Sequence, residues 1–167
     1  CKSKVKEGFY VFNVGDKIVY PMYGAGIIEG MEEKIIDGEN KLYYILRIPV
    51  GNLKITISVK KADTLGLREI SSSSEVLGII NEVEPIEMSD NWNQRYKDNV
   101  ERIKTGSLEK VVQVFKTLIF RERKKSLSSV EKKLLGTAKQ IILSEIILSN
   151  DVEREQAEAI LERAVIQ

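Results

Sequence analysis

The 167-residue chain contains no histidine, the side chain that most often serves as a general base or a metal ligand. Its single cysteine, Cys1, can form neither an internal disulfide nor a zinc site. The sequence has no GxxxxGK[ST] phosphate loop, and Glu29 occupies the position where the Gly24–Gly26 segment would need the third glycine of a dinucleotide fingerprint. Neighbouring carboxylates such as Glu32 and Glu33 would point to opposite faces of a strand. We therefore expect no enzymatic activity, no cofactor and no bound metal.

Long apolar segments are also missing. No run of about 18 apolar residues occurs, and the first residues lack the apolar core of a signal peptide, so we expect a cytoplasmic protein with no membrane contact. A hydrophobic fraction of 43% with 31% charged residues is sufficient for one or two compact domains. Residues 1–10 are expected to form a disordered or cloning-derived tail.

Charge is unevenly distributed, although the formal net charge is only +1. Residues 75–90 hold five acidic side chains and no basic one, whereas residues 92–139 hold thirteen Lys or Arg against five Asp or Glu. The chain becomes acidic again after Gln140. A basic block of this kind indicates a polyanion partner, although solvated helices also carry such blocks.

The first part of the chain has the pattern of short strands joined by turns. Pro21 and two glycines mark a bend, Asp37-Gly38 is typical of a hairpin, and residues 53–59 alternate between apolar and polar side chains. This spacing predicts a small antiparallel barrel of the SH3 or Tudor type. Barrels of this kind bind proteins or nucleic acids.

The second part has helical periodicity. We expect a hinge at Ser71–Ser74, a short helix over 75–81, and a helix capped by Ser89 or Asp90 that runs to about Lys104 and is ended by a left-handed Gly106. Three further helices are predicted to begin at Ser107, at the Ser128 and Glu131 capping box, and at Asp151. The fold class is thus α+β, with a barrel domain over residues 1–70 and an all-helical domain over residues 75–167.

Trp92 is the only tryptophan, and it stands near a predicted helix start with Arg95 and Lys97 on the next turn. A lone tryptophan usually packs in a core. An indole with cations close by can instead contact nucleic acid, the ring against the bases and the cations against phosphates.

Several motifs in this order resemble the CarD/CdnL family of bacterial transcription regulators. They are the FxVGDxIVYPxxGxG start at residues 12–26, the alternating strand at 53–59, NWxxRYK at 91–97, and the serine-capped basic helices that follow. The start alone is less specific, since the RNA polymerase-interacting domain of transcription-repair coupling factors shares it. The resemblance covers residues 12–165 and implies that the barrel binds the RNA polymerase β subunit. It also implies that the helical domain contacts promoter DNA with little sequence dependence.

In this family a tryptophan wedges into the minor groove and stabilises the open complex, which implies that role for Trp92. The resemblance implies phosphate contacts for Arg95 and Lys97, while Gln94 occupies a position that is often basic. The other candidate DNA contacts are Lys124, Lys125, Lys132 and Lys133. For the polymerase, the resemblance points to Lys34 and to the strand position of Thr56, where Lys54 on the same face is the alternative.

We therefore expect a monomeric regulator that reaches the nucleoid through RNA polymerase. An alternative is a protein-interaction adaptor whose basic face is only solvated. A third reading, an RNA-binding barrel of the ribosome-associated type, lacks the basic surface interleaved with aromatic residues that base stacking requires.

Overall fold

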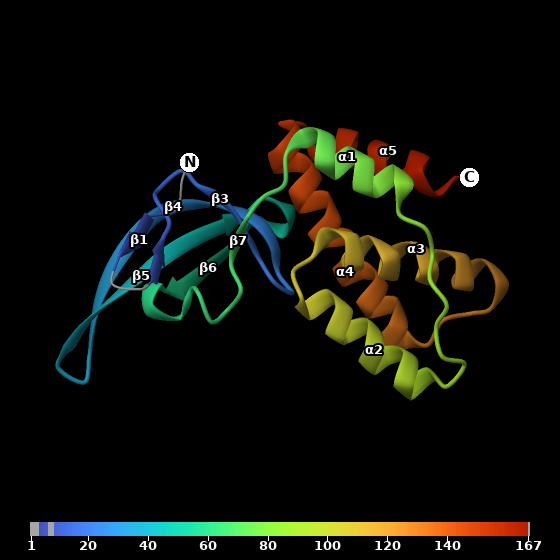
Figure 1. The fold of residues 1–167 in the computed structure, drawn as a ribbon, viewed down its shortest axis with the longest axis horizontal. Helices are drawn as coiled ribbons and strands as arrows, with labels where there is room; N and C mark the ends of the chain where they lie inside the picture. The colour runs from blue at the N-terminus through green and yellow to red at the C-terminus, as the bar shows by residue number, and fades with distance from the viewer. Residues whose placement is uncertain (1–3, 7–8, 167) are drawn as a thin grey trace.

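The structure is a computed structural model that describes residues 4–6 and 9–166, with side chains described from Phe12 to Ile166. A half made of strands is followed by a half made of helices (Figure 1). The strands are β1 (Lys4–Lys6), β2 (Phe9–Val11), β3 (Lys17–Tyr20), β4 (Gly24–Ile36), β5 (Glu39–Ile48), β6 (Leu53–Ser58) and β7 (Arg68–Glu69). The helices are α1 (Ser73–Glu82), α2 (Trp92–Lys104), α3 (Leu108–Lys124), α4 (Ser129–Asn150) and α5 (Arg154–Val165). None of the helices among the described residues is long and apolar enough to cross a membrane.

Five strands form an antiparallel sheet in the order β6-β5-β4-β3-β7. The Asp37-Gly38 turn joins β4 to β5 with φ angles of 52° and 76°, the left-handed conformation at both turn residues that suits a two-residue hairpin. The α+β prediction is confirmed. Over the described residues the sheet remains open, because β6 and β7 are its edges and do not pair with each other.

β1 and β2 pair with each other as a separate two-stranded sheet. Part of the expected tail, residues 4–6 and 9–10, therefore lies in paired strands. The remainder of that tail lies outside the described residues.

One face of the five-stranded sheet carries its apolar core. Tyr44 is fully buried there, and its hydroxyl oxygen accepts a hydrogen bond of 2.8 Å from the backbone N–H of Phe12. The predicted alternation of β6 is visible in burial, since Ile57 points into this core while Lys54 and Thr56 are exposed. The core residues of this half are Phe12, Ile18, Ile28, Tyr44, Leu46, Ile48, Ile57 and Ala62.

The helices pack around a second, larger core to which every helix except α2 contributes at least two buried apolar residues. Ser128 and Glu131 form the predicted capping box at the start of α4, and Gly106 is left-handed as predicted, with a φ of 73°. Two predicted starts are corrected. Asn91 caps α2 through its side chain, and Asp151 ends α4 in a left-handed conformation while α5 begins at Arg154.

The two halves are joined by a third apolar cluster, in which Val19 and Ala25 of the sheet meet Leu148 of α4. Polar contacts also join the two halves. Glu145 is buried on α4, and its carboxylate accepts hydrogen bonds from the Arg68 side chain and from the Ser71 backbone N–H. At the expected hinge, Ser72 caps α1 and Ser73 is its first residue. The serine run thus contains the start of α1 and is hydrogen-bonded to α4 through the Ser71 backbone N–H.

Candidate nucleic-acid and polymerase interface

Trp92 is the first residue of α2, and 52% of its surface is exposed. The Asn91 side chain caps the helix by accepting a hydrogen bond of 3.2 Å from the backbone N–H of Gln94. The indole therefore stands at a well-formed helix start and is not part of the helical core, in contrast to the usual packing of a lone tryptophan. A single exposed apolar side chain is common on protein surfaces, so the exposure of the indole makes it available for contact but does not by itself assign it a partner.

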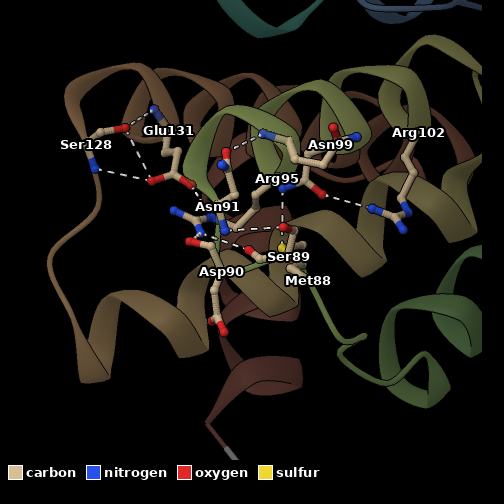
Figure 2. A network of polar contacts seen from close by, with 10 residues as sticks. Met88, Ser89, Asp90, Asn91, Arg95, Asn99, Arg102, Ser128 and Glu131 are labelled. Atoms are coloured by element: carbon tan, nitrogen blue, oxygen red, sulfur yellow. Dashed lines mark hydrogen bonds and ion pairs between the residues drawn. The ribbon is translucent and has the colours of Figure 1, made fainter.

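Arg95 has a different environment from the one predicted. Only 3% of the residue is exposed, and its Nε donates to Glu131 Oε1 at 2.5 Å (Figure 2). Its Nη1 donates to the backbone carbonyls of Ser89 and Asp90 at 3.0 and 3.2 Å. The predicted phosphate contact of Arg95 is therefore wrong, because its guanidinium is buried and already hydrogen-bonded within the protein.

Glu131 lies on α4 and uses both carboxylate oxygens. Oε1 accepts from Arg95, and Oε2 accepts from the backbone N–H and the hydroxyl of Ser128, each at 3.3 Å. Burial alone would raise the pKa of the Glu131 carboxyl. The hydrogen bonds from Arg95 and Ser128, together with the positive charge of Arg95, outweigh burial and hold the pKa below its ordinary value.

A signal for the burial of Arg95 exists in the sequence. Arg95, Asn99 and Ile103 follow one another at intervals of four residues, and all three are buried on α2. The same interval places Arg95 on the side of the helix that carries Ile103. Glu131 was recognised only as a capping residue, because nothing in a single sequence pairs it with a residue 36 positions away.

The other predicted DNA contacts are on the surface. Lys97 is exposed on α2, Lys124 is exposed at the end of α3, and Lys125 is exposed as its C-cap. Arg121, which sequence reasoning missed, borders the same surface pocket as these two lysines and Met88, just before the α2 cap. Lys132 and Lys133 are exposed in the first turns of α4. Lys132 also borders an apolar cavity with Glu122 and Glu162, so acidic groups lie near it.

The strand register brings the three predicted polymerase contacts onto one face of the sheet. Lys34 pairs with Lys41, and Thr56 and Lys54 pair with Ile45 and Arg47. Paired residues share a face, and residues two apart on β5 share it too. All these side chains therefore lie on the face opposite the buried Tyr44 and Leu46. Lys41 was missed, although pairing across the Asp37-Gly38 turn already places it opposite Lys34.

Comparison with known proteins agrees with this architecture. Residues 12–71 match the model of the CarD-like/TRCF RID domain, and residues 75–162 match the model of the CarD C-terminal domain. A Bacillus subtilis (strain 168) protein named "Putative transcription factor YdeB" is 34% identical over 149 residues, which span 87% of this chain and 97% of that protein. The strand half and the helical half thus correspond to the two family models, and the relative's name points to a transcription-related protein. The chain belongs to the CarD/CdnL family of bacterial transcription regulators.

Proposed function

We propose that this chain stabilises the open promoter complex without catalysing a reaction. In this proposal the exposed face of the sheet binds the RNA polymerase β subunit. The start of α2 and the basic residues of α3 and α4 contact the promoter duplex, and Trp92 wedges into its minor groove. The half-exposed indole at the first position of α2 is the observation that carries the proposal.

An indole at this position is suited to a contact that needs little sequence readout. Stacking of a base on an aromatic side chain contributes about 1–3 kcal/mol and tolerates any base, because every base has a flat face. Lys97, Lys124 and Lys125 can supply cations for phosphates nearby, since all three side chains are exposed. Cations of this kind fix the position of a protein on DNA but carry no sequence information.

The polymerase part of the proposal is supported by the family match of residues 12–71 and by the shared face of Lys34, Lys54 and Thr56. The contacts between Ala25 and Ser144 and between Arg68 and Glu145 then fix the DNA-facing half against the polymerase-facing half. Binding to polymerase would raise the local concentration of a weak DNA module next to the unwinding duplex. Neither contact needs to be strong alone.

The decisive experiment measures the lifetime of promoter open complexes formed by RNA polymerase with the wild-type protein, Trp92→Ala or Tyr23→Ala. Tyr23 is a matched control, because it is an aromatic residue with 50% exposure in the sheet half. Trp92→Ala should shorten the lifetime to the value without the protein while polymerase is still retained in a pull-down. Tyr23→Ala should keep the wild-type lifetime.

The alternative function, a protein adaptor without DNA contact, predicts a different outcome. Both variants would then behave like the wild type on promoter DNA, and the helical half would retain a protein partner whether or not DNA is present. A Trp92→Ala protein that folds and keeps full open-complex lifetime would favour this alternative.

A further inference from the structure

We propose that Arg95 is a positioning residue for Trp92 and acts through Glu131. The consequence for DNA rests on the function proposed above, whereas the positioning itself concerns only this chain. The relevant contacts form one network that joins the loop before α2, the first turns of α2 and the start of α4 (Figure 2).

Arg95 follows Trp92 by three residues on α2, so the two residues lie on adjacent turns of the helix. Trp92 is half exposed while Arg95 is enclosed. The exposed part of the indole therefore lies within one helical turn of Arg95, the residue that bonds α2 to α4.

Three separate attachments meet at the guanidinium. Nε donates a hydrogen bond to the Glu131 carboxylate at 2.5 Å, and Nη1 donates to the Ser89 and Asp90 carbonyls at 3.0 and 3.2 Å. The last two belong to the segment that leads into the Asn91 cap. The direction in which the chain enters α2 is thereby tied to the same group that ties α2 to α4.

Glu131 is itself fixed, because its second oxygen closes the capping box with Ser128. A carboxylate bound on both oxygens has little freedom to follow a shifting partner. Arg95 is therefore bonded to a rigid point on α4, and the start of α2 takes its position from that point.

An ion pair at this depth is better suited to fixing geometry than to adding stability. Desolvating two charges offsets most of their attraction, so an apolar pair of similar volume often stabilises a core equally well. A planar guanidinium adds directional donors in a fixed fork, which a lysine ammonium lacks. This difference makes Arg95→Lys an informative variant, since it keeps the charge and removes the fork.

The test uses the full chain and the fluorescence of Trp92, its only tryptophan. In Arg95→Lys, we expect the anisotropy of Trp92 to fall and its quenching by acrylamide to rise, while urea unfolding remains cooperative. Open-complex lifetime should fall toward the Trp92→Ala value. In a Trp92→Ala background, Arg95→Lys should cause no further loss, because its effect passes through the indole.

The matched control is Leu161→Ala, a buried residue of α5 whose truncation destabilises the same domain without touching this network. It should leave the anisotropy of Trp92 unchanged. An unchanged anisotropy in Arg95→Lys, or an equal fall in Leu161→Ala, would overturn the positioning role.

Glu131→Asp provides a second variant that keeps both charges and shortens the carboxylate arm by one methylene. It should loosen Trp92 in the same way. If both Arg95→Lys and Glu131→Asp abolish cooperative folding, Arg95 is a stability residue and the inference fails. If Trp92 loosens in these variants but Trp92→Ala leaves open complexes unaffected, the positioning role stands and the proposed function fails.

Discussion

The hydroxyl of Ser144 accepts a hydrogen bond of 2.8 Å from the backbone N–H of Ala25, although the two residues are 119 positions apart in the sequence. Ser144 also donates to the carbonyl of Ile141 at 2.6 Å, and both Ser144 and Ala25 are fully buried. This contact brings β4 directly against the C-terminal half of α4. Gly24 is next to it, and its missing side chain is what allows so close an approach.

The first prediction is that Gly24→Ala disturbs the junction between the halves. A Cβ at Gly24 would lie 2.6 Å from Ser144 Oγ, at a φ of 114° that disfavours alanine. Gly15→Ala is the matched control, because its φ is 93° but nothing lies within 4 Å of the added atom. Urea unfolding should show an extra loss of about 1–3 kcal/mol for Gly24→Ala over Gly15→Ala, owing to overpacking. Equal losses would mean that the junction accommodates the added methyl group without a further loss in the free energy of unfolding.

A second prediction concerns the independence of the two halves. Apart from Val50, which packs into the helical core, the sheet and the helices have their own cores, so we expect that a fragment ending near Ile70 folds and retains the polymerase β subunit without DNA. The fragment from Glu75 should bind DNA weakly and not retain polymerase. Both should be less stable than the full chain, because Glu145 loses Arg68 and Ser71. Polymerase retention by the helical fragment alone would contradict this division.

DNA affinity is expected to depend steeply on salt. Each phosphate contact contributes about −0.9 to the slope of log affinity against log salt on duplex DNA. Replacing Lys124 and Lys125 with alanine should therefore reduce the slope by about 1.8 if both contact phosphates. Lys60 and Lys61, two exposed lysines of the sheet half, provide the control pair and should leave the slope unchanged. A wild-type slope near zero would mean that the basic face is only solvated.

Substitutions on the exposed face of the sheet should test the candidate polymerase contacts on β4 and β6. Lys34→Glu with Lys54→Glu should slow association with polymerase, most strongly at low salt, because peripheral charges mainly steer encounter. Lys54→Ala and Thr56→Ala, measured singly, decide which side chain of the shared face makes the contact. Lys41→Glu should add to the loss, since Lys41 pairs directly with Lys34. Lys110→Glu, an exposed position at the start of α3, is the control.

Acid should weaken the helical half through Glu131. Its folded-state pKa is lowered, so its ionised form contributes stability that is complete above the ordinary value of 4.5 and is lost as the pH falls through the lowered pKa. The free energy of unfolding should therefore decrease below about pH 4.5 more steeply in the wild type than in Glu131→Gln. At neutral pH, Glu131→Gln should cost about 3–5 kcal/mol, as expected when one partner of a buried pair is removed. Parallel pH profiles would mean that other carboxylates control acid unfolding.

Local patterns were enough to predict most of the elements, although β1, β2 and β7 were not predicted. The Asp37-Gly38 turn, the left-handed Gly106 and the capping box of Ser128 depend on a few neighbouring residues, and all three have the predicted conformation. The two misplaced helix starts, at Asn91 and Arg154, lie where several polar residues compete to cap the helix. Choosing among such neighbours depends on how the finished helix packs.

By itself, the sequence determined the α+β class, the change from strand to helix near the serine run, and the family, because periodicity, turn chemistry and motif order are local properties of the chain. The environment of each charged residue was decided only by the tertiary structure. Arg95 and Lys97 are two positions apart and carry the same charge, yet one is enclosed by Glu131 and the other faces solvent. The reason is physical: burial and ion pairing depend on which distant segment packs against a helix face, and for Arg95 that segment is the start of α4.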